Sequence, residues 1–377
     1  MNCMKNLITI INLVLWSSLS IAITTSPYVP VYESDYGYKK EESIAIAIPP
    51  AKNQLLPDNC WAVTSSYAIE SILCQQEKIS DCSKINSERQ DLVVSPFAVS
   101  GLNRKIRETS GNCIDAFSKL DLNAGSAAGV LNNYIDYSCP GVPSNQCYPM
   151  DKFINLLQNQ KDFEKKIREN SLGKDLQGNI CIECAIDEVQ KAMGTTVPEK
   201  AVKTYKEVFD SKNLVGQTMF SDCRKKGLIL EMGPPSPNIY NFPPFKYDSQ
   251  LKINVNNYAD EFTDQEFINK IKEVLSKTKQ TVVMEGFCGE YIDGKCAFDH
   301  AQLITGYRKV CKCASGSGSS CKPNNNDCRE LVQVLNTWGK SWQKNNNDGW
   351  VDAHELLKAR VPKSLSLTWM QPRYIKP

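Results

Sequence analysis

The most informative stretch of the chain is residues 54–62, which read Gln54-Leu55-Leu56-Pro57-Asp58-Asn59-Cys60-Trp61-Ala62. Asp58 or Asn59 can cap a helix, and the apolar residues that follow recur at helical spacing, so the sequence predicts a helix that begins near Cys60. The positive end of a helix dipole and its unpaired N–H groups favour a thiolate. Cys60 is therefore a candidate nucleophile, although a cysteine at a helix start is, taken alone, more often structural.

Two later segments and one earlier residue supply the groups that a cysteine nucleophile needs. His300 precedes a short predicted strand, and Asn336 ends another. An Asn side chain can accept from one imidazole nitrogen and fix the tautomer, which leaves the other nitrogen to face the thiol. Gln54, six residues before Cys60, could donate its amide to an oxyanion beside the backbone N–H of Cys60.

The segments Gln54–Ala62, Asp299-His300-Ala301 and Asn336-Thr337-Trp338-Gly339 through Trp342 resemble, in this order, the signature segments of papain-like cysteine peptidases. The resemblance implies an α+β fold with two lobes, one helical and one β-barrel-like, and a cleft between them. Cys60 would lie on the helical lobe, and His300 and Asn336 on the other. The implied activity is hydrolysis of peptide bonds in polypeptide substrates, through a Cys-His-Asn triad and a thioester acyl-enzyme.

The same resemblance assigns the substrate side of the site. Gly125 matches the glycine whose backbone pairs with the substrate chain, and Trp338 would shield the hydrogen bond between His300 and Asn336. Trp342 completes this group of substrate-binding residues. The resemblance implies no cofactor and no metal.

The chain departs from the family pattern just before the nucleophile. Pro57 stands where the family usually has a cysteine, and Leu122 stands near the position of that cysteine's partner. Since both halves are missing together, the departure indicates a lost disulfide. Asp58-Asn59 replaces the usual Gly-Ser, which alters the floor of the site but not the triad.

The resemblance and the composition together predict five segments. Residues 1–22 form a signal peptide, 23–45 an extended lead-in, 46–150 the helical lobe, 151–260 a mostly helical insertion and 261–377 the β lobe. The insertion is predicted from its dense Lys and Glu residues and from its closing Pro-Pro pairs. Within the last segment, residues 266–277 have the pattern of an amphipathic helix, and residues 281–284, 303–305 and 331–335 read as strands.

Export follows from the N-terminus and the cysteine count. Lys5 precedes an apolar run, Leu7–Ile21, which is shorter than the roughly 20 residues of a membrane-spanning helix. Cys3 leaves with the signal, so 15 of the 16 cysteines remain, an odd number that fits one free thiol and up to seven disulfides. We expect a secreted or periplasmic protein with no stable membrane association. A net charge of +2 is too small an excess of positive charge to indicate nucleic-acid binding. The oligomeric state is not predicted.

Three other patterns have simpler explanations than a site. The pairs Cys181/Cys184 and Cys311/Cys313 are expected to form structural disulfides rather than bind metal or act as redox motifs. Residues 344–355 mimic a calcium loop, but Lys344 occupies the first ligand position. His354, the second of two histidines, is expected at the surface.

Two alternatives remain open at this stage. The chain could be a catalytically inactive papain-like binding protein, although no triad residue is lost. It could also be a transglutaminase-like amide-transfer enzyme, which the spacing of Gln54 and the Asn-Thr-Trp-Gly segment disfavour.

Overall fold

The computed structural model describes residues 24–32, 38–52, 54, 59–77, 79, 81–103, 113, 125–136, 139, 141–147, 223–231, 237–243, 246–248, 253–255, 261–316 and 320–372. Helices and antiparallel sheet both contribute substantially, so the fold is α+β, as predicted. The predicted signal peptide and most of the predicted insertion lie outside the described residues.

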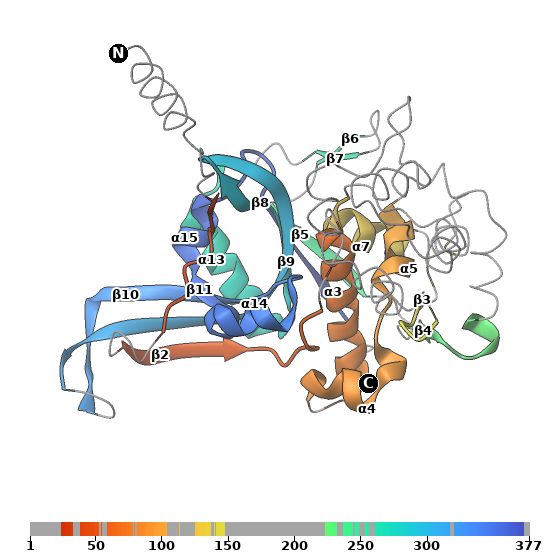
Figure 1. Cartoon of the computed structure of the whole chain (residues 1–377), viewed down its shortest axis with the longest axis horizontal. Helices are drawn as coiled ribbons and strands as arrows, with labels where there is room; N and C mark the ends of the chain where they lie inside the picture. Colours follow the sequence, from red (N-terminus) through yellow and green to blue (C-terminus); the bar gives the residue numbers. More distant parts are fainter. Residues whose placement is uncertain are drawn as a thin grey trace, which may run out of the picture.

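An antiparallel sheet of eight strands forms the largest element of the described structure (Figure 1). Its main path runs β11-β10-β9-β8-β12-β5, with β1 paired to β8 and β2 paired to β9. Two short sheets, β3-β4 and β6-β7, lie apart from it. The strands are β1 (Thr24–Thr25), β2 (Tyr38–Ala45), β3 (Gly141–Pro143), β4 (Ile229–Glu231), β5 (Asn238–Phe242), β6 (Lys246–Asp248), β7 (Ile253–Val255), β8 (Val282–Ile292), β9 (Lys295–Ser315), β10 (Lys322–Leu335), β11 (Trp350–Asp352) and β12 (Ser366–Gln371).

The helices fall into two groups, which Figure 1 shows on either side of the sheet's central strands. The first group is α3 (Cys60–Gln76), α4 (Ile85–Glu88), α5 (Pro96–Ser100) and α7 (Ala127–Asp136), and the second is α13 (Asp264–Glu273), α14 (Gly339–Asn345) and α15 (Ala353–Lys358). A π-helical turn, Val274–Thr278, extends α13, and short 3-10 turns cover Cys82–Lys84, Gln90–Leu92, Gly101–Asn103 and Asn347–Gly349.

Helix α3 is the centre of the first group. Every residue from Cys60 to Cys74 is buried, so this helix is enclosed on all sides and does not present only one apolar face. Most of its buried hydroxyls bond locally or across to the sheet, although that of Ser71 has no partner among the described residues; Ser65, for example, donates to the carbonyl oxygen of Trp61 over 2.7 Å. Such bonds allow a polar residue to be buried at little cost.

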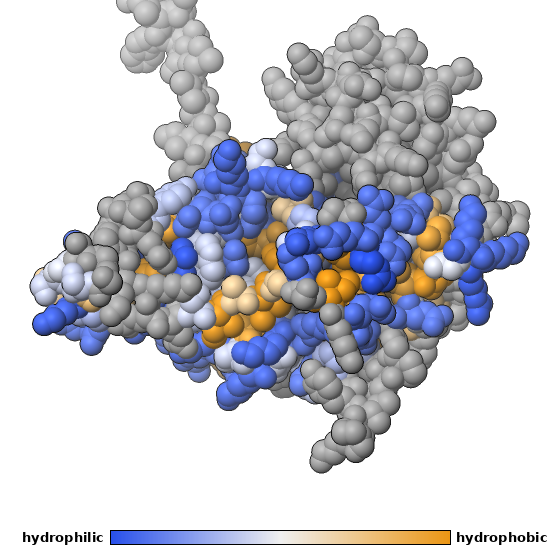
Figure 2. Space-filling view, turned by 90° about the horizontal axis from the view of Figure 1, so that it is seen from below, coloured by the Kyte–Doolittle hydropathy of each residue, from blue (hydrophilic) through white to orange (hydrophobic). Residues whose placement is uncertain are grey.

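Two clusters of buried side chains stabilise the fold. One surrounds α3 and includes Val283 and Leu303 of the sheet face that α3 covers. The other fills the space between the sheet, α13 and α15, and contains Phe267 and Phe287. Figure 2 shows one face of the molecule, where hydrophilic residues cover much of the described surface and apolar residues gather along its middle.

The predicted lead-in is part of the sheet. Strand β2 pairs with β9 from Tyr38 opposite Lys312 to Ala45 opposite Gly306, and β1 pairs with the end of β8. Neither strand shows an alternation clear enough to predict it, because the strand that each pairs with lies more than 250 residues further along the chain.

Residues 148–222, which include most of the predicted insertion 151–260, begin and end at a closed neck formed at Cys147 and Cys223. A disulfide joins Cys147 to Cys223, and β3 pairs with β4 directly beside it. The described parts between Cys223 and residue 260 contain four short strands and one helical turn, while residues 151–222 of the predicted insertion lie outside the described residues. Strand β5 pairs with β12 and therefore belongs to the main sheet, which places part of the β half before residue 261.

Six disulfides occur in the described residues, which fits an exported protein. Cys311 pairs with Cys328 and Cys313 with Cys321, so the structural interpretation of that pair is confirmed. Cys181 and Cys184 lie outside the described residues. Within the described parts, no helix has the length and apolar character that crossing a membrane requires.

Candidate active site

Cys60 is the first residue of α3, as the sequence predicts, and it is buried with 6% of its surface exposed. Among the described cysteines it alone is outside a disulfide. Asn59 occupies the N-cap position, so the position of the predicted cap is confirmed. Its side chain makes no capping hydrogen bond, so the predicted interaction is wrong. Cys60 therefore lies at the N-terminal end of a helix, where the helix dipole favours negative charge.

His300 lies on β9, Asn336 directly follows the neighbouring strand β10, and the two side chains are joined by a hydrogen bond. His300 Nε2 is 2.8 Å from Asn336 Oδ1, which also accepts from the backbone N–H of Thr337 over 2.7 Å. Because a carbonyl oxygen can only accept, the imidazole carries its proton on Nε2. Its other nitrogen, Nδ1, is buried and has no hydrogen-bond partner among the described residues.

Burial sets the protonation state of His300. The side chain is almost fully enclosed, and this desolvation lowers its pKa to about 4, while the hydrogen bond to Asn336 acts in the opposite direction. The imidazole is therefore neutral near pH 7. The helix start at Cys60 predicts a thiolate, which would pair with an imidazolium; burial of His300 instead favours a neutral ring with an unprotonated Nδ1.

Helix α3 and strand β9 are joined close to both groups. Thr64, one helical turn after Cys60 and on the same face, donates to the carbonyl oxygen of Ala301 over 3.0 Å. Ala301 directly follows His300. This bond places the start of α3 against the part of β9 that carries the imidazole.

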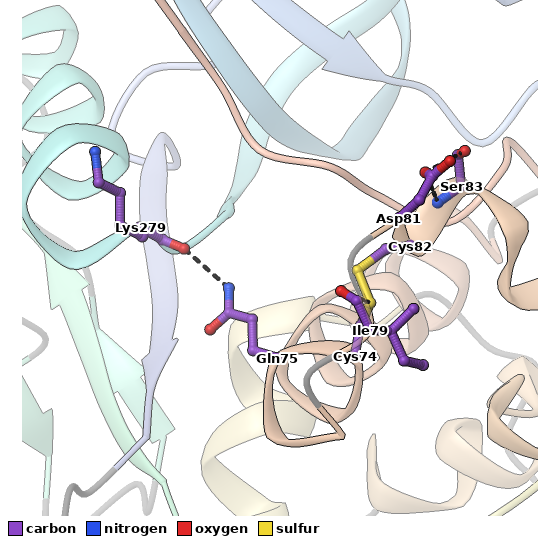
Figure 3. The surroundings of a disulfide bond; sticks show 7 residues. All are labelled: Cys74, Gln75, Ile79, Asp81, Cys82, Ser83 and Lys279. Carbon is purple, nitrogen blue, oxygen red and sulfur yellow. Dashed lines mark hydrogen bonds between the residues drawn. A yellow bond between two sulfur atoms is a disulfide. The ribbon is translucent and has the colours of Figure 1, made fainter.

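The other end of α3 is also fixed (Figure 3). A disulfide joins Cys74 to Cys82, and the amide of Gln75 donates to the carbonyl oxygen of Lys279 over 2.9 Å. Lys279 lies between α13 and β8, on the sheet side of the molecule. Since α3 is held to the sheet side at both ends, its N-terminus cannot rotate freely relative to His300.

Gln54 lies beside the segment that carries Asn336. Its backbone N–H donates to the carbonyl oxygen of Thr337 over 2.6 Å, and the Thr337 hydroxyl donates to Gln54 Oε1. With the carbonyl end of this amide held by Thr337, the Nε2 end is the group that could donate to an oxyanion. The oxyanion role itself stays a prediction.

Aromatic rings enclose the imidazole. The ring centroid of Trp338 lies 4.9 Å from that of His300, and those of Phe287 and Phe298 lie 5.5 and 6.0 Å away. Trp342 contacts Trp338, at 6.0 Å between centroids. Trp338 therefore lies against the imidazole, and its predicted shielding of the His300–Asn336 bond stays a prediction.

Gly125 lies against the residue that follows the nucleophile. A Cβ atom at Gly125 would come within 2.6 Å of Trp61 Cε2, so no other residue fits without displacing that ring. The structure thus brings Gly125 near the start of α3. Its predicted pairing with a substrate backbone stays a prediction.

Sequence reasoning missed Tyr28, which lies in the predicted lead-in. Its ring packs against Trp338 and Trp342, with centroids 5.7 and 4.8 Å away, and its hydroxyl donates to Gln302 Oε1 over 2.8 Å. The surrounding Pro and Tyr residues have no clear period, so the sequence carried no signal for this contact.

Two remaining predictions concern His354 and metal binding. His354 is partly exposed and lies 3.3 Å from Glu330, away from the candidate site. No group of three or more His, Cys, Asp or Glu side chains that could hold a metal ion occurs in the part of the chain that the structure describes.

Comparisons with known proteins find matches among solved structures. No protein-family model and no curated protein matches the chain. Among solved structures, it is similar to a recombinant stem bromelain precursor, with a TM-score of 0.36 and 14% sequence identity over 98% of this chain and 89% of that chain. We draw nothing about the activity from a similarity at this level.

Proposed function

We propose that the chain is an exported cysteine peptidase of the papain-like type, with a helical lobe around α3 and a β lobe around the main sheet. One observation carries the proposal. His300 donates from Nε2 to Asn336 and keeps a buried Nδ1 that has no partner among the described residues, on a strand bonded directly to the helix that begins at Cys60. A neutral imidazole held this way can accept a proton at Nδ1, because this nitrogen forms no structural hydrogen bond to the described residues.

The reaction would be an acyl transfer in two stages. The Cys60 sulfur bonds to the carbonyl carbon of a peptide while its proton passes to His300 Nδ1. The oxyanion that forms would accept from the backbone N–H of Cys60 and from the amide of Gln54. His300 then returns the proton to the departing amine as the C–N bond breaks, which leaves a thioester on Cys60.

Hydrolysis of the thioester completes the cycle. His300, neutral again, takes a proton from water as the water oxygen attacks the thioester carbon, and the thiol regains a proton when the acid product leaves. The hydrogen bond to Asn336 persists through both stages and keeps the ring in one orientation. No redox or cofactor step is needed for this balance.

Labelling of Cys60 tests the proposal. The purified protein would be treated with an epoxysuccinyl-peptide inhibitor and weighed intact, in parallel with a Cys60→Ala variant. One adduct that is absent from the variant, together with cleavage of a casein substrate, is expected. A folded protein that forms no adduct and cleaves nothing would support the inactive binding protein instead.

A second assay separates peptidase from amide transfer. A transglutaminase-like enzyme would incorporate a primary amine into glutamine side chains of casein, whereas a peptidase would release new amino termini. Release of amino termini without amine incorporation is expected. Amine incorporation that disappears in Cys60→Ala would overturn the proposal in favour of amide transfer.

A further inference from the structure

Residues 24–32 are fixed to the sheet half on both sides of Tyr28. Before it, Thr24 and Thr25 pair with Ile292 and Tyr291 of β8. After it, the carbonyl oxygen of Val29 accepts from Asp352 N over 3.0 Å, and Pro30 forms an isolated bridge with Val351. The segment is thus held at two points, and the Tyr28 side chain extends from the backbone between them.

That side chain, Tyr28, is 4% exposed and enters the aromatic cluster around the imidazole. The two rings that flank His300 most closely are Trp338 and Phe287, and both also contact Tyr28, with centroids 5.7 and 6.3 Å away. All three Tyr28 ring contacts are edge-on, a favourable geometry for aromatic pairs. Tyr28 therefore packs against Trp338 and Phe287, the two rings that contact the imidazole most closely.

The Tyr28 hydroxyl is held by the strand that carries His300. It donates to Oε1 of Gln302, a fully buried residue two positions after His300 and on the same face of β9. Burial raises the pKa of Tyr28 well above its usual value, with a smaller contribution from the charge of Cys60, while the nearby Asn336 side chain opposes part of the rise. The phenol thus keeps its proton and remains a donor throughout the working pH range.

We propose that Tyr28 is a positioning residue for the His300–Asn336 pair, so that the N-terminal segment is part of the active site. This inference rests on the proposed function. Tyr28 acts through Gln302, Trp338 and Phe287 and holds the imidazole in the orientation in which Nε2 meets Asn336. It takes no part in proton transfer itself.

The test replaces Tyr28 by Phe, which keeps the ring and removes the hydroxyl. We expect kcat to fall about fivefold with KM unchanged, the factor that corresponds to losing one neutral buried hydrogen bond. The nitrogen–proton NMR spectrum of the two histidines gives a second readout. His300 should change from one Nε2–H tautomer to a mixture, while His354 stays the same.

Two further variants make the result interpretable. Tyr32→Phe is the matched control, because the Tyr32 hydroxyl also donates from this segment but reaches only an exposed carbonyl oxygen, that of Asn345 at 3.4 Å. The double variant Tyr28→Phe/Gln302→Leu removes both partners, which restores stability without restoring the bond. It should keep the fall in kcat.

The outcomes are distinct. An unchanged His300 spectrum and an unchanged kcat in Tyr28→Phe, with a lower unfolding temperature, would overturn the positioning role. Recovery of kcat in the double variant would overturn it as well, since activity would then follow stability. If the parent protein cleaves no peptide but His300 responds to Tyr28→Phe and not to Tyr32→Phe, the proposed function fails and the positioning role stands.

Discussion

Replacing Lys52 by Met should strongly destabilise the fold, because it leaves a buried carboxylate without its cation. Lys52 Nζ pairs with Glu70 Oε1, and Glu70 also accepts from the backbone N–H of Val94 over 2.7 Å. The Glu70 side chain is fully buried and that of Lys52 is 14% exposed. Lys52 lies two residues before Gln54, and Glu70 lies on the helix that begins at Cys60, so the pair joins the two segments of the candidate site.

The expected cost is about 3–5 kcal/mol of unfolding free energy at pH 7, the range for breaking a buried ion pair by removing one partner. The lower part of this range applies, because Lys52 is not completely enclosed. For comparison, Lys84→Met removes an exposed pair with Asp81, at 3.8 Å, and should change the free energy by less than about 0.5 kcal/mol. The double variant Lys52→Met/Glu70→Gln should recover most of the loss.

The cost should depend on pH in a defined direction. Burial raises the pKa of Glu70 above its usual value, and Lys52 opposes that rise, so the pKa rises further in Lys52→Met. A carboxyl group with a raised folded-state pKa favours the neutral form in the native protein. The difference in unfolding free energy between the parent and Lys52→Met is therefore absent at acid pH, opens as the pH rises above the folded-state pKa of Glu70 in the parent, and levels off above the higher folded-state pKa of the variant.

Urea unfolding under non-reducing conditions, followed by tryptophan fluorescence from pH 4 to 8, measures this cost. The free energies of the parent and of Lys52→Met should converge at the acid end and separate toward pH 8. A loss below 1 kcal/mol at pH 7, or a gap between the two proteins that does not vary with pH, would refute the reasoning. The same experiment on the double variant should show no such gap.

Three further predictions concern the site and its supports. Gly125→Ala should lower the unfolding free energy by about 1–3 kcal/mol in urea, because its Cβ would collide with Trp61. The rate of Cys60 alkylation by iodoacetamide should fall below about pH 4, since the folded-state pKa of His300 lies near 4 and below its ordinary 6.5; an acid limb near 6.5 would contradict this. Glu285→Gln should cost about 1–2 kcal/mol in thermal unfolding, because Glu285 Oε2 accepts from the first backbone N–H of α7 over 2.7 Å.

Local patterns predicted the parts of the fold that depend on neighbouring residues. The helix at Cys60 and the strand ending before Asn336 were both predicted from spacing, and the structure has α3 and β10 there. The helix predicted over residues 266–277 begins slightly earlier, at Asp264. Thr263 and Glu266 form a capping box that the apolar pattern alone did not reveal.

Features that depend on distant partners were not predictable. His300 was expected before a short strand, but it lies inside β9, which continues to Ser315 because β2 and β10 pair with it on both sides. Burial of Tyr28 depends on Gln302, 274 positions away. The neutral state of His300 follows from its enclosure, which a residue pattern does not contain.

The closed neck at Cys147 and Cys223 has a consequence for how the chain tolerates change. A single backbone cleavage anywhere in residues 148–222 leaves both new ends covalently attached to the folded body until the disulfide is reduced. The entropy of closing a loop grows only slowly with its length, so the number of residues between Cys147 and Cys223 has little influence on the entropy of holding these two cysteines together.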